Sequence, residues 1–342
     1  MNEYLDGPDR EFVYVQGYGF TDGPRKPDMN SMIRAYSNAL GCTLIAFLAL
    51  QNFVPLVVVM LMRMGNPAIR IYNNQFIASS DTIEVISIWS SLICYCLPIL
   101  LLCAFLHLGA HTVFPRRLPR AGEALPAAGL VLASSVIGSM VAMLLSALLA
   151  LVNLHPTGPG LPEADNVRSL MLAAASSALM PAIFEELLFR GAILQSLRRF
   201  GEPFALFCST LLFALLHRNL VQFPNAFITG MLLGFLALRT GTLLVPMLCH
   251  FINNLVPLLL NFFLVGLPEE SVSRAYIGLN VVYLAAGVVG ALYLLRTRPQ
   301  FFTPLHRDVP RAERRKLSAF FGSVPLLAVV VLLVVQIILN LF

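Results

Sequence analysis

Long apolar stretches dominate the chain and restrict it to very few folds. Of its 342 residues, 58% are hydrophobic and 12% are charged, which is far too apolar for a soluble protein. A helix that crosses a bilayer needs about 20 apolar residues. Together with the need to satisfy backbone polar groups inside lipid, this pattern predicts an all-α polytopic membrane protein with about nine transmembrane helices. The predicted spans are 39–62, 83–107, 126–154, 169–197, 203–217, 221–238, 243–264, 275–295 and 318–342.

The spans and the polar segments between them divide the chain into four parts. The first is a polar, solvent-exposed tail that lacks the apolar core of a signal peptide. Three peripheral helices come next, then a core made of spans four to seven, and finally two C-terminal helices joined by a basic loop, 296–316. The predicted boundaries are 1–37, 38–168, 169–264 and 265–342.

The basic residues are distributed unevenly between the two sides of this nine-span arrangement. One side receives 17 of the 23 Lys and Arg residues and the other receives 5. Cytoplasmic loops are enriched in Lys and Arg, so the count predicts a multi-pass protein of the cell membrane with a cytoplasmic N-terminus. The formal net charge of +5 is explained by the loops, and we expect no nucleic-acid partner.

The fourth span carries ionisable side chains where lipid makes them costly. Residues 184–191 read FEELLFRG and contain Glu185, Glu186 and Arg190. Such residues inside a span usually mark a functional site. Glu186 and Arg190 are four residues apart, so they lie on one helix face and can form an ion pair. Glu185 points about 100° away from Glu186 and is free to face a cavity. Pro181 has no N–H to donate to the carbonyl of Ser177, so we expect a local distortion of the helix there.

Two later spans each carry a histidine on an apolar helix. The fifth span ends in Phe213 and His217, and the seventh contains His250 and Asn254, each pair spaced four residues apart. If residues 198–202 form a turn between antiparallel helices, Glu185 and His217 stand at matching depth, about 21 Å and about 22 Å from the turn. The depth of His250 is left open by this argument. A lone histidine in a helix usually serves packing, but these three residue sets together predict a polar site within the membrane.

The residue types suit hydrolysis of an amide bond. That reaction needs a base that activates water and donors that stabilise the developing oxyanion, and a carboxylate, two imidazoles and a carboxamide supply both. No serine or cysteine is clearly placed beside the group. Cys249 precedes His250 but points about 100° away from it, which disfavours a covalent nucleophile.

The three motifs EExxxR, FxxxH and HxxxN, in this order on consecutive apolar helices, resemble the CPBP family. This family comprises CAAX-prenyl endopeptidases and bacteriocin-processing enzymes, also called Abi proteins. The resemblance covers about residues 169–264 and departs from the family pattern at none of the six positions. It implies an intramembrane endopeptidase in which Glu185 and His217 activate a water, His250 and Asn254 stabilise the oxyanion, and Glu186 and Arg190 orient the site.

The resemblance leaves the metal requirement open. The family is often labelled as metalloproteases, and Glu185, His217 and His250 could bind zinc with one open position. The chain contains no HExxH helix, however, and a water activated by glutamate needs no ion. We therefore expect that no cofactor is required, with zinc as the alternative.

The expected partners are the lipid bilayer and a membrane-associated peptide or protein substrate, which could carry a lipid. Two other functions remain open at this point. The first is a non-catalytic membrane scaffold or bacteriocin-immunity protein with the same fold. The second is an ion-coupled transporter, because buried Glu, His and Arg also form proton relays; the sequence lacks the repeated halves typical of many transporters.

Overall fold

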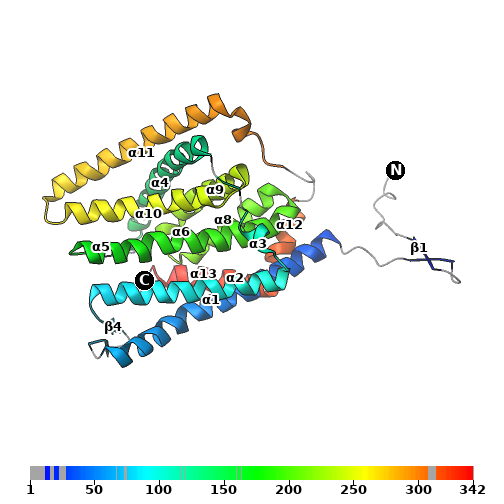
Figure 1. The fold of residues 1–342 in the computed structure, drawn as a ribbon, viewed down its shortest axis with the longest axis horizontal. Helices are drawn as coiled ribbons and strands as arrows, with labels where there is room; N and C mark the ends of the chain where they lie inside the picture. The colour runs from blue at the N-terminus through cyan, green and yellow to red at the C-terminus, as the bar shows by residue number, and fades with distance from the viewer. Residues whose placement is uncertain are drawn as a thin grey trace.

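The structure is a computed structural model, and it describes residues 12–15, 19–22, 28–66, 68–72, 75–115, 117–118, 120–158, 160–162, 164–306 and 313–341. Six long helices each form a single element, and most of them run alongside one another in Figure 1. They are α1 (Met29–Gly65), α2 (Ser80–Leu106), α4 (Ala121–Ala150), α9 (Gln222–Thr240), α10 (Leu244–Leu264) and α11 (Glu269–Thr297).

A seventh long helix, Val167–Phe200, changes its hydrogen-bond pattern several times along its length. Two of its segments, η1 and η2, are π-helical, and π-turns within α-helices often occur at functional sites. Segment η1 lies just before Pro181, where an N–H is missing. The expected distortion near this proline is thus confirmed. The segments are α5 (Val167–Ala174), η1 (Ala175–Leu179), α6 (Met180–Glu185), η2 (Glu186–Ile193), α7 (Leu194–Leu197) and η3 (Arg198–Phe200).

Shorter elements complete the described part of the chain. Helix α8 follows η3 and packs against α9, while α13 packs against α1. Two antiparallel hairpins, β1–β2 and β3–β4, lie outside the long helices, and the sequence analysis did not predict them. The elements are β1 (Phe12–Val15), β2 (Gly19–Asp22), β3 (Arg70–Tyr72), β4 (Gln75–Ile77), α3 (Ala110–Val113), α8 (Glu202–Leu216), η4 (Pro299–Phe302), α12 (Glu313–Phe321) and α13 (Val324–Leu339).

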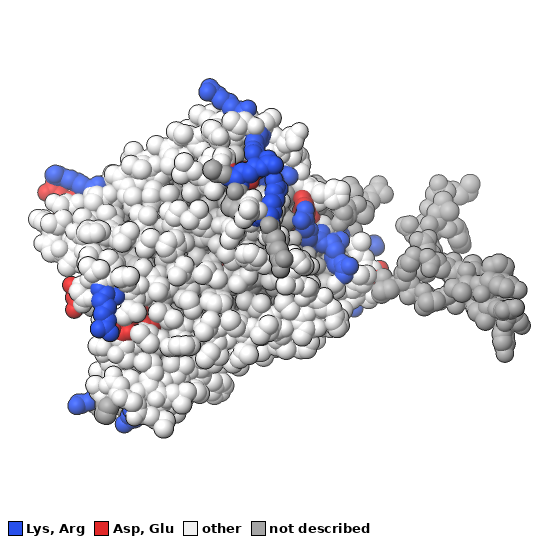
Figure 2. All heavy atoms as spheres, in the orientation of Figure 1, with Lys and Arg blue, Asp and Glu red and all other residues white. Residues whose placement is uncertain are grey.

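The distribution of charge along the helices is that of a membrane protein. On the face in view in Figure 2, charged side chains gather toward the two ends of the bundle, and the surface between them is uncharged. Within the described residues, seven helices are long and apolar enough to cross a membrane, or eight if a bent pair of helices counts as one span. The all-α, polytopic fold is confirmed.

Every predicted span coincides with a helix, but two of the nine are not simple spans. The predicted segment 203–217 forms α8, which has only 15 residues. At 1.5 Å per residue such a helix is about 22 Å long, shorter than the ~30 Å hydrocarbon layer. The predicted segment 318–342 is bent by 78° between α12 and α13. The apolar stretches of the sequence predicted which residues form helices. Their length did not predict that one helix is too short to span the bilayer or that another is bent.

Small residues let the helices around the core approach closely. A Cβ atom on Gly129 of α4 would lie 2.5 Å from the carbonyl oxygen of Ala286 on α11. On the other side of α4, a Cβ on Gly138 would lie 2.6 Å from the Cα of Asn225 on α9. Close backbone contact at small residues is the usual way in which membrane helices pack. It holds α4 and α9 together as one wall of the cavity described next.

Candidate active site

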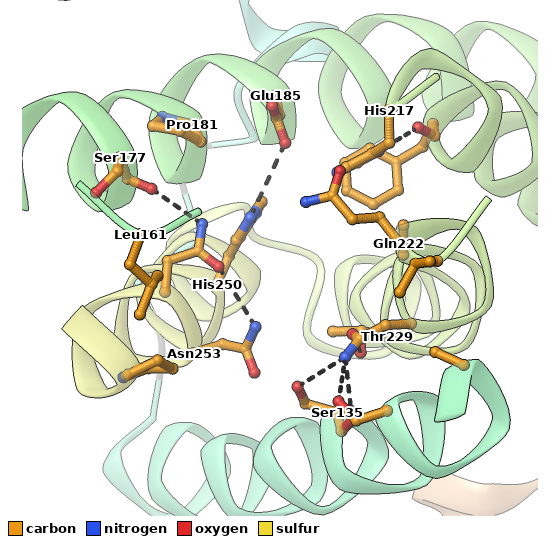
Figure 3. A pocket seen from close by; sticks show the side chains of 18 of the residues that line it. Ser135, Leu161, Ser177, Pro181, Glu185, His217, Gln222, Thr229, His250 and Asn253 are labelled. Atoms are coloured by element: carbon orange, nitrogen blue, oxygen red, sulfur yellow. Dashed lines mark hydrogen bonds and ion pairs between the residues drawn. The ribbon is translucent and has the colours of Figure 1, made fainter. Parts of the chain in front are cut away.

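A cavity of about 850 Å³ lies between α4, the broken helix Val167–Phe200, α8, α9 and α10. Four of the six predicted site residues line it: Glu185, His217, His250 and Asn254. In Figure 3, Glu185, His217 and His250 surround one open space, although they come from three different helices. The convergence expected from the sequence is thus present. The other two residues, Glu186 and Arg190, are fully buried behind the wall.

Glu186 and Arg190 form the expected ion pair. The Arg190 Nη1 donates to Glu186 Oε1 at 2.8 Å, and the side chains are 1% and 0% exposed. The other end of the guanidinium donates to the carbonyl of Gly230 at 3.0 Å, and its carbon lies 4.2 Å from the centre of the Phe213 ring. Arg190 thereby ties η2 to both α8 and α9. A buried charge is tolerated only when it is paired and hydrogen-bonded in this way.

His250 lies between the two glutamates. Its Nδ1 is 2.9 Å from Glu186 Oε1, and its Nε2 is 3.9 Å from Glu185 Oε2. A carboxylate only accepts hydrogen bonds, so His250 Nδ1 carries the proton in its hydrogen bond to Glu186. The ring is therefore oriented by Glu186, and Nε2 is directed toward Glu185. Adjacent glutamates on one helix thus have different tasks, because their side chains point in different directions.

Glu185 uses its two oxygens differently. Its Oε1 accepts a hydrogen bond of 2.9 Å from the hydroxyl of Tyr95 on α2, while Oε2 faces His250. The 3.9 Å gap at Oε2 is too long for a direct hydrogen bond and short enough for both groups to share one water molecule. The arrangement holds the carboxylate on one side and leaves the other side available for chemistry.

The sequence analysis missed Tyr95, which lies in a span outside the three motifs. Its ring is 5.0 Å from that of Phe47 and 6.2 Å from that of Phe184, centre to centre. One signal could have identified it. Tyrosines of membrane proteins gather at the two interfaces, whereas Tyr95 lies near the middle of α2. A tyrosine at that depth needs a partner for its hydroxyl.

Phe213 explains why a phenylalanine precedes His217 by four residues. Its carbonyl accepts from His217 Nδ1 at 2.9 Å, which leaves Nε2 of a neutral ring as an acceptor. The Phe213 ring also contacts both imidazoles edge-on, with 4.8 Å between the ring centres for His217 and 6.2 Å for His250. A single aromatic side chain thus fixes the two histidines and covers the Arg190 guanidinium.

Asn254 lines the cavity and is itself held in place. Its Nδ2 donates to the carbonyl of Ser177 at 3.3 Å, the carbonyl that Pro181 cannot serve. Its Oδ1 accepts from Asn253 at 3.4 Å. A carboxamide has two N–H groups, so Asn254 keeps one donor for a ligand.

A second polar wall faces these residues from α4 and α9. Asn225 donates to the hydroxyl of Ser139 at 2.9 Å and to the carbonyl of Ser135 at 3.1 Å, and Thr229 donates to Asn225 at 3.1 Å. The sequence analysis did not identify this cluster, because each residue is a common polar residue in a helix. Its hydroxyl and amide groups make one side of the cavity suitable for a peptide backbone.

The three candidate zinc ligands, Glu185, His217 and His250, come from three different helices. Within the described residues, no three His, Cys, Asp or Glu side chains form a group that could hold a metal ion. Glu185, His217 and His250 do not form such a group in this arrangement, and no step below depends on a metal ion.

Gly230 offers a direct test of this packing. A Cβ there would lie 2.8 Å from the Phe213 ring and 3.1 Å from Arg190 Nη2. We expect Gly230→Ala to destabilise the protein by about 1–3 kcal/mol, because both groups are fixed by other contacts. Thermal unfolding in detergent measures the effect. Gly278→Ala on α11 is the control, since a Cβ there meets nothing within 4 Å. Equal unfolding temperatures for the two variants would contradict the packing described here.

One comparison with known proteins finds a match. Residues 167–256 match a family described as type II CAAX prenyl endopeptidase Rce1-like. No curated protein and no solved structure matches the chain. The matched segment includes all six predicted site residues, whereas Tyr95 lies outside it. This match supports the resemblance to CAAX-type endopeptidases, and it covers residues 167–256, about a quarter of the chain.

Proposed function

We propose that the protein is an intramembrane endopeptidase that hydrolyses a peptide bond in a membrane-associated protein or peptide. One observation carries the proposal above all others. A carboxylate and an imidazole, Glu185 and His250, lie 3.9 Å apart in a cavity of about 850 Å³ between apolar helices. Such a cavity can hold both a peptide segment and water, and the pair can bind that water between them.

In the proposed reaction, Glu185 Oε2 takes a proton from the water, and the water oxygen attacks the carbonyl carbon of the scissile bond. The tetrahedral intermediate then forms with a negative charge on the former carbonyl oxygen. The proton held by Glu185 passes to the amide nitrogen and the C–N bond breaks. The products are an amine and a carboxylic acid, which then loses its proton to solvent and becomes a carboxylate. General acid–base catalysis of this kind contributes about 10²- to 10⁴-fold to a rate.

The other cavity residues complete the site. His217, whose Nε2 is an acceptor when the ring is neutral, assists Glu185 in orienting the water. The free N–H of Asn254 and, in its protonated form, Nε2 of His250 donate to the oxyanion. Preorganised donors of this kind are often the largest single contribution to catalysis.

The family match and the location of the cavity support the proposed substrate class. The name of the matching family refers to CAAX prenyl proteins, and we propose a membrane-associated substrate that can carry a lipid. Counted over the nine predicted spans, Lys and Arg are in excess on the side of the N-terminus, and on that count we propose a cell-membrane protein whose N-terminus is cytoplasmic.

The proposal is tested with purified protein in proteoliposomes. Peptides tethered to the same membrane by an N-terminal lipid are added as a library, and mass spectrometry detects cleavage. An endopeptidase produces two complementary fragments from at least one peptide. A scaffold or immunity protein produces none, and that outcome would contradict the proposal.

Tyr95 is expected to position Glu185. Tyr95→Phe keeps the ring contacts with Phe47 and Phe184 and removes only the hydroxyl. We expect kcat to fall about tenfold with little change in KM, because a hydrogen bond to a charged group is lost while no substrate contact changes. Tyr283→Phe is the control: the Tyr283 hydroxyl is buried and has no hydrogen-bond partner among the described residues. A rise in KM alone would assign Tyr95 to substrate binding instead.

A further inference from the structure

A second hollow adjoins the active-site cavity. It has a volume of about 370 Å³ and is lined by His217, Arg218, Asn219, Gln222, Gln336 and Asn340. His217 and Gln222 also line the main cavity, so the two spaces share a wall. Figure 3 shows Gln222 on the same side of the main cavity as His217. Every side chain around the hollow is polar, which is unusual in a protein as apolar as this one.

The charge in the hollow is positive. Arg218 is half-buried, and in the described part of the chain its guanidinium has no hydrogen bond or ion pair with a carboxylate. None of the six lining residues is acidic. Two other arginines of the core differ in this respect: Arg190 pairs with Glu186, and Arg198 pairs with Glu202. An arginine that is partly desolvated and unpaired is suited to bind an anion.

The backbone at Arg218 is held in a costly conformation. Its φ is 52°, in the left-handed region that residues other than glycine rarely adopt. Its carbonyl accepts from Asn340 on α13 at 2.8 Å. Asn219, the next residue, donates to the carbonyl of Thr157 and accepts from the backbone N–H of Val221. Strained backbone that several separate segments hold in place occurs preferentially at ligand sites.

Gln336 provides an independent indication that the hollow takes a ligand. Its side-chain oxygen is buried and has no hydrogen-bond partner among the described residues. Because the oxygen and nitrogen of a carboxamide are interchangeable by rotation, Gln336 can present either atom to a ligand. A buried polar group without a partner costs free energy, and a bound ligand removes that cost.

We propose that this hollow binds a carboxylate of the substrate peptide beside the scissile bond. The inference rests on the proposed function, because the ligand is part of the peptide that the main cavity would bind. A guanidinium binds a carboxylate through two parallel hydrogen bonds, and the carboxamides of Gln222 and Gln336 supply further donors. The carboxylate comes either from the C-terminus of the substrate or from an acidic side chain near the cleaved bond.

Matched peptides distinguish these two sources. One pair of membrane-tethered peptides differs only in a C-terminal carboxylate or carboxamide, and another differs only in Asp or Asn after the cleaved bond. For one of the pairs, we expect the wild-type protein to cleave the charged peptide with a kcat/KM about 10- to 100-fold higher than that of its uncharged partner. In Arg218→Gln this ratio should fall to about 1. Arg274→Gln should keep the wild-type ratio, because Arg274 is exposed and paired with Glu270.

A second variant, Arg218→Gly, removes the charge and suits a positive φ. It separates loss of charge from misfolding, and it too should lose the preference. The inference would be overturned, and the proposed function would stand, if the wild type cleaved both peptides of each pair equally. The same holds if the preference for the charged peptide survived in Arg218→Gln. A third outcome would also overturn it. If phosphatidylglycerol raised the cleavage rate over that in phosphatidylcholine equally for all peptides, and only when Arg218 was present, the hollow would bind lipid phosphate instead. If the wild type cleaves no peptide at all, the proposed function fails, and the inference fails with it.

Discussion

Glu185→Gln will lower kcat/KM about 10³-fold in the proteoliposome assay, because the carboxamide cannot take a proton from water. The change preserves the shape of the side chain. A glutamine oxygen can still accept the hydrogen bond from Tyr95, so we expect the unfolding temperature to stay close to that of the wild type. The loss should appear in kcat rather than in KM, because Glu185 acts on the water and not on the substrate.

Glu269→Gln is the matched control. Glu269 lies in the first turn of α11, is exposed and is not among the residues that line the cavity. This variant should keep wild-type activity. If Glu185→Gln also kept wild-type activity, Glu185 would not be the base, and His217 or His250 would have to replace it.

Arg190→Met will cause the largest loss of stability. The change leaves the carboxylate of Glu186 buried without its cation, and breaking a buried ion pair from one side costs about 3–5 kcal/mol. Thermal unfolding in detergent measures the loss. Arg198→Met provides a control at the same i, i+4 spacing: Arg198 is 47% exposed and pairs with Glu202, so its removal should cost only about 0–1 kcal/mol.

A double variant separates stability from catalysis. Glu186→Gln combined with Arg190→Met removes both charges and should recover most of the lost stability. Its activity should remain low, because His250 Nδ1 then faces a neutral amide instead of a carboxylate. A double variant as unstable as Arg190→Met would show that the Gly230 and Phe213 contacts of Arg190, rather than its charge, hold the core together.

The contacts that could be predicted from the sequence are those within single helices. The Glu186–Arg190 pair follows from a spacing of four residues, and the separate direction of Glu185 follows from the helical repeat. The distortion near Pro181 follows from its missing N–H. All three depend on local geometry, which the sequence determines directly.

Contacts between helices were harder to predict, because they depend on how deep each helix lies and how the helices cross. Matching depth was predicted for Glu185 and His217, and both line the cavity. The depth of His250 was left open, and the structure places it 3.9 Å from Glu185. Tyr95, Gly230 and the hollow at Arg218 carry no motif. They gain significance only once α2, α9 and α13 are packed around the core.

The most direct test of the central claim is a comparison of protein termini in living cells. N- and C-termini of the membrane proteome are mapped in cells that carry the wild-type protein and in cells that carry Glu185→Ala. Our account predicts at least one membrane protein whose cleaved terminus is present with the wild type and absent with the variant. Identical sets of termini in the two strains would contradict the assignment of this cavity as a peptide-bond hydrolase.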